Sequence, residues 1–130
     1  MPQPEGKVLY AAAKAGKLDE VEAAVDAGAP MEWANPDVSG WRAVHAASNN
    51  GRKDVVAFLG SRGADVNAVD DCQQTPLHLA AAFGRASVCT TLLALGADPA
   101  AKAKDGNTAL DRARKSNEPE CVAVLEAAMR

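Results

Sequence analysis

The chain has 130 residues and a formal net charge of −3 at pH 7. This length predicts a single domain with a modest core, and the weakly acidic balance gives no general field that would attract nucleic acid or an anionic membrane surface. The opening MPQPEGK has no apolar segment of the kind found in signal peptides, and every apolar run is shorter than the roughly 18 residues that a membrane span needs. We therefore expect a soluble, cytoplasmic protein, with the nucleus as the alternative compartment.

The chain repeats itself at a fixed interval. The segments GRKDVVAFLGSRGADVNA and GRASVCTTLLALGADPAA, which begin at Gly51 and Gly84, align without a gap at an offset of 33 residues. The same offset relates His45 to His78 and the TPL motif at Thr75 to a later TAL motif. An upstream match, GKLDEVEAAVDAGA, lies at an offset of 35, so two extra residues fall within PMEWANPDVSGW. These offsets predict four units, at about residues 5–37, 38–70, 71–103 and 104–130.

The units differ mainly in how their first predicted helix begins. VLYAAAKAG in the first unit has no capping residue, and RAVHAA in the second unit has Arg42 and Ala43 at the first two positions. In the third unit, TPLHLAA offers Thr75 as an N-cap, followed by a proline at the first helical position, where the missing N–H costs nothing. The fourth unit, TALDRARK, has Asp111 in place of the histidine. The third unit therefore has the best-defined helix start.

A second helix and an extended loop complete each predicted unit. In the third unit Val88, Leu92 and Leu93 form one apolar stripe, and Gly96 is the C-cap. The segments ADVNAVDDCQQ and ADPAAKAKDGN are rich in turn-forming residues and are predicted to project as hairpin-like loops. Because no unit can bury its own stripe, the units must stack on one another, which predicts an all-α solenoid.

The motifs TPLHLAA and GADVN, together with the 33-residue period, resemble the ankyrin repeat family. The resemblance implies an all-α ankyrin-repeat solenoid of four helix-turn-helix units with hairpin-like loops, similar in size and layout to myotrophin-like small ankyrin proteins. The end units of such an array need solvated outer faces, so we expect a complete, capped array that is a monomer. The charged residues available for these faces are Lys7, Lys14, Lys17, Asp19, Glu20 and Glu22 in the first unit, and Arg112, Arg114, Lys115, Glu118 and Glu126 in the last.

Histidines and cysteines are the first candidates for chemistry. His45 and His78 recur one period apart at the start of a buried helix, so both are predicted to be structural rather than catalytic or metal-binding. Cys89 and Cys121 fall on apolar stripes and are expected to be small buried hydrophobes. Cys72 lies in a turn, where the acidic residues beside it favour an inert thiol over a modifiable one. Because the sequence contains no recognised nucleophile motif, phosphate loop or cofactor motif, we expect that the protein is not an enzyme.

The resemblance implies that the loop tips and the exposed edge of each first helix line a concave groove that binds a partner. Two aromatic residues at these positions, Trp41 and Phe83, are candidate anchors, and Trp33 lies in the adjoining long turn. For the two tryptophans, packing over the two-residue insertion against the first unit is an equal alternative. The candidate groove residues are Trp33, Ser39, Trp41, Asn49, Asn50, Asp71, Cys72, Gln74, Ala82, Phe83, Lys104, Asp105, Asn107, Lys115 and Ser116.

The predicted function is a non-catalytic protein-interaction module, without a cofactor, whose partner protein the sequence does not identify. The alternative is a regulatory or targeting subunit that recognises lipid head groups or nucleic acid through the basic run from Lys102 to Lys115. A solvated capping face is the simpler interpretation of that run, because no aromatic residue interleaves it. Asn67, eight residues after Leu59, also resembles ankyrin asparagine-hydroxylation sites, although a turn held by its side chain is the favoured explanation.

Overall fold

The computed structural model describes residues 5–130, which form eight α-helices in four consecutive pairs. Within this range the only extended pairing is an isolated antiparallel bridge between Asn35 and Trp41. The predicted all-α fold is therefore confirmed. The helices are α1 (Glu5–Ala15), α2 (Leu18–Asp26), α3 (Ala43–Asn49), α4 (Lys53–Ser61), α5 (Pro76–Ala82), α6 (Ala86–Ala94), α7 (Ala109–Lys115) and α8 (Pro119–Ala128).

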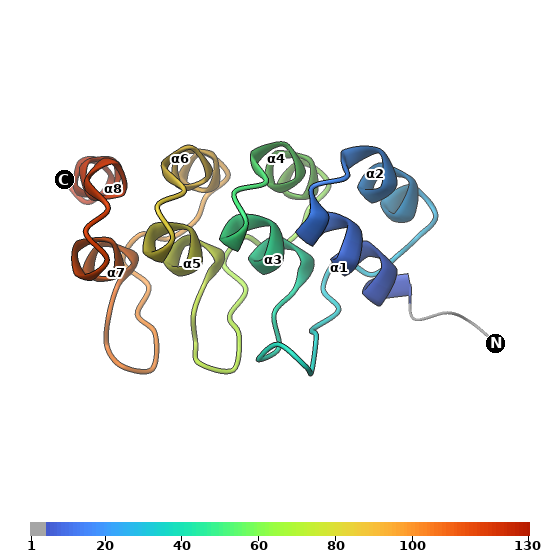
Figure 1. Cartoon of the computed structure of the whole chain (residues 1–130), viewed down its shortest axis with the longest axis horizontal. Helices are drawn as coiled ribbons and strands as arrows, with labels where there is room; N and C mark the ends of the chain where they lie inside the picture. Colours follow the sequence, from blue (N-terminus) through green and yellow to red (C-terminus); the bar gives the residue numbers. More distant parts are fainter. Residues whose placement is uncertain (1–4) are drawn as a thin grey trace.

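Figure 1 shows that the pairs stack in chain order along the long axis of the molecule. The first helices of the pairs, α1, α3, α5 and α7, form one row, and α2, α4, α6 and α8 form a second row above it. Each helix contacts its partner in the pair and the equivalent helix of the neighbouring unit. Long loops project below the first row, so the molecule is the predicted solenoid with a wall of loops along one side.

Apolar residues at equivalent positions of successive units form one continuous core. Val21, Val56 and Cys89 occupy the same position of α2, α4 and α6, and each is 0% exposed. Alanines such as Ala13 lie buried in the first helices, where a small side chain permits close approach of the neighbouring helix. Cys89 and Cys121 are both buried, as predicted, and burial raises the pKa of each thiol. These two cysteines therefore serve as small core residues.

The first and last units carry charges at positions that are buried in other units. Glu20 is exposed in α2, whereas the equivalent Val88 of α6 is fully buried. Arg114 in α7 takes the place of the buried Ala81, and its guanidinium pairs with Glu126 at 2.9 Å. Both end units are therefore more polar at these positions than the inner units, as expected for solvated outer faces.

Arg52 and Arg85, at the starts of α4 and α6, bind the second unit to the first and the third unit to the second. The Nε–H of Arg52 donates to the carbonyl oxygen of Lys14 at 3.1 Å, and the arginine side chain lies against Gly16. Gly16 has a φ of +77°, in the left-handed region, and a Cβ there would lie 2.7 Å from Cδ of Arg52. Arg85 repeats the arrangement over Gly51 one unit later. The glycine after these first helices thus serves both the turn and the contact between units.

The second unit begins its first helix at the predicted position, but without a side-chain cap. Arg42 and Thr75 both have an extended backbone, with φ and ψ of −96° and 174° for Arg42 and of −91° and 166° for Thr75. The Thr75 hydroxyl accepts from the N–H of His78 at 3.4 Å, whereas the Arg42 side chain makes no capping hydrogen bond. The Arg42 guanidinium instead pairs with Glu32 at 2.7 Å. The two helix starts therefore have the same backbone and different side-chain contacts.

We predict that Arg42→Thr raises the free energy of unfolding. A regained N-cap stabilises a helix start by about 0.5–2 kcal/mol. The partly exposed ion pair with Glu32, which the substitution removes, is worth about 0.2–1 kcal/mol. Urea denaturation measures the difference, with Arg42→Ala as the control that loses the ion pair and gains no cap. If Arg42→Thr proves no more stable than Arg42→Ala, the assignment of the cap position is wrong.

Candidate binding groove

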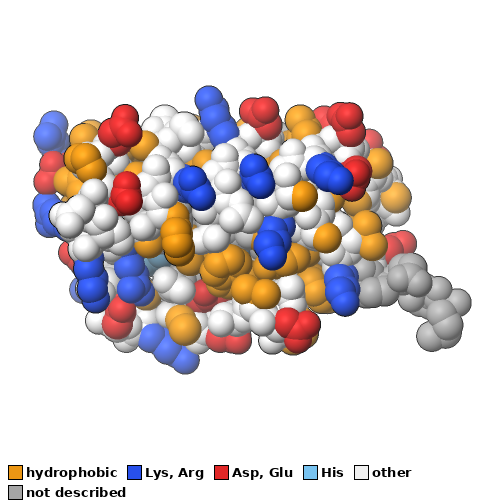
Figure 2. Space-filling model, in the orientation of Figure 1, with side chains coloured by type: hydrophobic (Ala, Val, Ile, Leu, Met, Phe, Trp, Pro, Cys, Tyr) orange, Lys and Arg blue, Asp and Glu red, His pale blue; other side chains and the backbone are white. Residues whose placement is uncertain are grey.

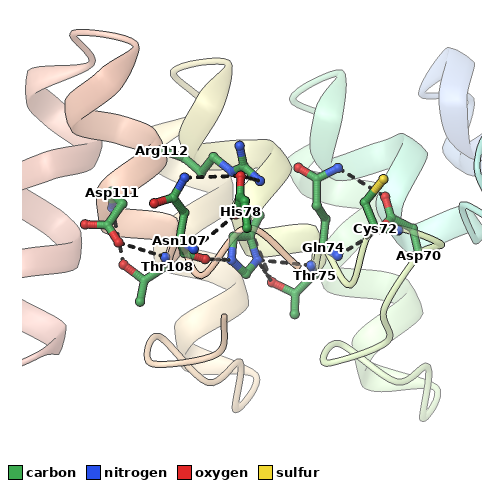
Figure 3. A network of polar contacts seen from close by, with 10 residues as sticks. Asp70, Cys72, Gln74, Thr75, His78, Asn107, Thr108, Asp111 and Arg112 are labelled. Carbon is green, nitrogen blue, oxygen red and sulfur yellow. Dashed lines mark hydrogen bonds and ion pairs between the residues drawn. The ribbon is translucent and has the colours of Figure 1, made fainter. Parts of the chain in front are cut away.

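Two buried histidines join the start of a first helix to the loop of the next unit. In His78 the Nδ1 atom accepts from the N–H of Thr75 at 3.1 Å, and the Nε2 atom lies 2.9 Å from the carbonyl oxygen of Asn107 (Figure 3). His45 makes the equivalent Nε2 contact with the carbonyl oxygen of Gln74 at 3.1 Å. Because Nδ1 accepts only when it carries no proton, Nε2 is the donor and both imidazoles are neutral. The predicted structural role of both histidines is confirmed.

Asp70 holds the loop between the second and third units from within. It is 4% exposed, and its Oδ1 atom accepts from the N–H of Cys72 at 2.9 Å and from the N–H of Gln74 at 2.8 Å. Its Oδ2 atom accepts from Nε1–H of Trp41 at 3.0 Å. Trp41 is half-buried and its only side-chain polar group is already bound, so only part of the ring is available to a partner. The sequence shows two adjacent aspartates here and does not indicate that Asp70 is the buried one.

Trp33 belongs to the packing of the first unit. Its ring lies edge-on to Tyr10, with 5.9 Å between the ring centroids and 76° between the ring planes. Gly6 of α1 is buried against it, and a Cβ at Gly6 would collide with the Trp33 side chain. Of the two interpretations of the tryptophans, packing against the first unit is therefore confirmed for Trp33. Trp33 is half-buried, like Trp41, and its place among the candidate groove residues stays a prediction.

Phe83 is the most exposed aromatic residue in the described part of the chain. It is the C-cap of α5 and is 56% exposed. Figure 2 shows hydrophobic side chains gathered in a band along the row of first helices, above the loops. Among the other candidates, the exposed residues are Ser39, Asp71, Cys72, Lys104, Asp105, Lys115 and Ser116, and the half-buried residues are Asn49, Asn50, Gln74, Ala82 and Asn107.

Backbone hydrogen bonds join the tips of neighbouring loops. The N–H of Asp71 donates to the carbonyl oxygen of Ser39 at 2.8 Å, and the N–H of Lys104 donates to the carbonyl oxygen of Cys72 at 3.0 Å. The two donor residues occupy equivalent positions, 33 residues apart, and their side chains are exposed. The loops therefore form a connected wall that is held by the backbone, while the side chains of Asp71 and Lys104 face solvent.

The basic run of the fourth unit is partly neutralised by carboxylates. Arg112 pairs with Asp105 at 3.1 Å, and Arg114 pairs with Glu126 at 2.9 Å. Hydrogen bonds from Asn107, with a further contribution from the Arg112 guanidinium, hold the pKa of Asp105 below its usual range. The lysines of the run remain exposed and make no ion pair with any residue in the range 5–130: Lys102, Lys104 and Lys115.

The Asn67 side chain bridges the loops that follow α4 and α6. Its Nδ2–H donates to the carbonyl oxygen of Gly96 at 3.1 Å, and its Oδ1 atom accepts from the N–H of Asp98 at 2.8 Å. Its backbone N–H donates to Oδ1 of Asp65 at 2.9 Å. The Asn67 side chain therefore joins the second unit to the third, and the side chain that holds the turn itself is that of Asp65, which differs from the predicted arrangement.

A polar hollow lies between the loop that joins α4 to α5 and the loop that joins α6 to α7. It is lined by Cys72, Gln74, Lys104, Asp105 and Arg112, most of which appear in the network of Figure 3. Among residues 5–130, no three His, Cys, Asp or Glu side chains are placed to hold a metal ion. No helix in that same range has the length and hydropathy needed to cross a membrane.

The repeated sequence of the chain matches a known protein family. The family described as ankyrin repeats (many copies) matches residues 9–59 and 45–93, which together span more than half of the chain. The chain belongs to the ankyrin repeat family. The resemblance inferred from TPLHLAA and the 33-residue period is thereby confirmed. Ankyrin repeats are in general a non-catalytic fold that mediates protein–protein interaction.

Relatives with this ankyrin region are much longer than the chain. It is 36% identical over 107 residues to RelA-associated inhibitor of Mus musculus, and the aligned segment covers 81% of this chain and 13% of that protein. It is 30% identical over 125 residues to diacylglycerol kinase zeta of Rattus norvegicus, covering 95% of this chain and 13% of the kinase. It is 42% identical over 78 residues to potassium channel KOR2 of Oryza sativa subsp. japonica, covering 60% of this chain and 11% of the channel. The shared part is thus the ankyrin module of proteins with different activities.

We predict that the free energy of unfolding falls as the pH is lowered below about 6.5. Burial lowers the pKa of His45 and His78, so over this range the unfolded chain takes up protons that the folded chain does not. As the pH falls, the loss of free energy of unfolding begins near the pKa of the histidines in the unfolded chain. It is complete once the pH is below their lower pKa in the folded chain. Each histidine contributes a slope of at most about 1.4 kcal/mol per pH unit.

Denaturant unfolding between about pH 7 and pH 5, a range above the usual pKa of exposed carboxylates, measures this slope. The matched control is the double variant His45→Gln, His78→Gln, which removes both titrating groups and should have a flatter dependence. The same slope in the wild type and the control would show that the buried imidazoles are not its source.

We predict that Asn67→Ala lowers the free energy of unfolding by about 1–2 kcal/mol, because two inter-unit hydrogen bonds are lost and each contributes about 0.5–1.5 kcal/mol. Asn67→Asp is the matched variant, because it keeps the acceptor for Asp98 and replaces the donor to Gly96 by a carboxylate oxygen that repels the Gly96 carbonyl oxygen. Its expected loss is at least as large. Thermal or urea denaturation that finds Asn67→Ala as stable as the wild type would mean that these bonds add nothing beyond hydration.

Proposed function

We propose that the chain binds a partner protein through the groove between its first helices and its loop wall, and that it does so without catalysis or a cofactor. The supporting observation is Phe83, which presents 56% of its surface to solvent on the edge of the first-helix row. An exposed aromatic residue is a frequent energetic anchor of protein interfaces. The half-buried Trp41, held by Asp70 at 3.0 Å, adds a rigid apolar surface in the second unit.

Charged end units support a monomer as the binding form. Glu20 and Arg114 replace residues that are buried in the inner units, so stacking a second copy on either end would bury unpaired charge or break the Arg114–Glu126 pair. We further propose a cytoplasmic location for the binding event. Recognition of lipid head groups or nucleic acid by the Lys102 to Lys115 run has less support, because Arg112 and Arg114 already pair with carboxylates.

We predict that Phe83→Ala weakens partner capture by at least about 2 kcal/mol, or roughly thirtyfold, while the melting temperature stays nearly unchanged. The reason is that an exposed anchor contributes to the complex and little to the fold. Affinity capture from a lysate of the source organism, followed by mass spectrometry, gives the readout. Val8→Ala is the control, because Val8 is 55% exposed and lies at the opposite end of the array.

Two results would contradict this role of Phe83. Capture of the same proteins in the same amounts by Phe83→Ala and by the wild type would remove Phe83 from the binding surface. A large drop in melting temperature for Phe83→Ala would show that the side chain packs in the fold, where truncating an aromatic residue costs about 3–5 kcal/mol.

A further inference from the structure

We propose that the groove takes an extended acidic peptide segment, with a large apolar side chain on Phe83 and carboxylates over the fourth unit. This inference rests on the proposed function and names the chemistry of the partner. The observations that carry it are the exposed lysines of the fourth unit and a change in the sign of the charge along the loop wall.

The helix side of the groove becomes basic at the fourth unit. Equivalent positions of α1, α3, α5 and α7 hold Lys14, Asn49, Ala82 and Lys115. The two middle positions are neutral, and Lys115 is exposed next to the end of α5, where Phe83 lies. An apolar anchor is therefore followed by a positive charge on the neighbouring helix.

The loop side of the groove changes sign at the same place. Asp71 and Lys104 hold equivalent positions in successive loops, and each uses its backbone N–H to bind the preceding loop. The exposed side chain of Asp71 gives a negative charge to the tip of the loop before α5, here called the third loop. The exposed side chain of Lys104 gives a positive charge to the tip of the loop before α7, here called the fourth loop. Lysines thus stand on both sides of the groove only at the fourth unit, which favours carboxylates there and disfavours them over the third loop.

Four of the other charged residues near the fourth unit form ion pairs, Arg112 with Asp105 and Arg114 with Glu126. Arg112 pairs with Asp105 at 3.1 Å, so their charges cancel, and Lys104 is the remaining charged residue in the lining of the hollow between the loops. The carboxylate of Glu118 lies against Gly84, at the short turn between α5 and α6 that follows Phe83. Lys104 and Lys115 lie in the loop and in α7, one unit further along, and neither pairs with a described carboxylate. The two lysines at the groove therefore stand beyond Phe83, toward the end of the array.

The spacing of the units sets the spacing within the segment. Neighbouring packed helices lie about 8–10 Å apart, and an extended chain advances about 3.3 Å per residue, so one unit corresponds to about three residues. Carboxylates on the segment are thus expected to begin about three residues from the apolar anchor. The order is fixed as well, because the anchor lies over the third unit and the carboxylates lie over the fourth.

A selection from displayed random peptides of about twelve residues, enough to cross four units, tests the inference on the full chain. The expected winners have a Phe, Leu, Met or Trp with Asp or Glu clustered about three residues to one side. Their affinity should fall roughly three- to tenfold for Lys104→Asp, rise for Asp71→Lys, and decrease with added salt. Both substitutions leave the backbone bonds of the loop tips in place, and Lys53→Asp, on α4, is the control with the same charge change.

The outcomes separate this inference from the proposed function. Selected peptides without an acidic bias, or peptides that bind Lys104→Asp as tightly as the wild type, overturn the inference. If such peptides still bind Phe83→Ala more weakly than the wild type, the proposed groove itself is retained. Winners that are indifferent to Phe83→Ala contradict the proposed groove itself. A failure to enrich any peptide contradicts both. Equal affinity for a random single-stranded oligonucleotide would show an unselective polyanion surface and would also overturn the inference.

Discussion

Among residues 5–130 no helix pair has a core of its own, so the contact between one unit and the next stabilises this whole part of the molecule. The helices α3, α5 and α7 have 7 residues each, far fewer than the roughly 12–15 at which an isolated helix becomes marginally stable in water. They persist because neighbouring units cover their apolar sides in a single core that runs from Leu9 to Leu125. His45 and His78 add directional bonds that fix each first helix to the next loop.

The residues that hold the units together are different from the exposed residues that line the groove. The loop tips are joined by backbone bonds from Asp71 and Lys104, whose side chains are exposed, with the Asp71 carboxylate lying against Gly40 of the preceding loop. A charge can therefore be changed at either position without disturbing the stack. The loop tips thus combine backbone contacts between units with exposed side chains, which is the arrangement expected of a site built on a scaffold.

Features that depend on local chemistry can be predicted from the sequence. The period, the start of α5 at Thr75 and the buried histidine follow from capping rules and from repetition. The contacts of the second unit cannot be predicted in this way, because two extra residues interrupt the period there and no equivalent residue in another unit indicates them. The bonds of Trp41 to Asp70 and of Arg42 to Glu32 join residues far apart in the chain, and they became visible only in the structure.

An NMR titration of the ¹⁵N-labelled chain with its captured partner protein tests the location of the binding surface most directly. Binding in the groove predicts that the largest amide shifts fall at Phe83, Lys104 and Lys115 and at the loop tips beside them. The helices α2, α4 and α6 of the second row should then change little. Shifts confined to that second row would place the partner on the opposite face and would contradict the groove as the functional site.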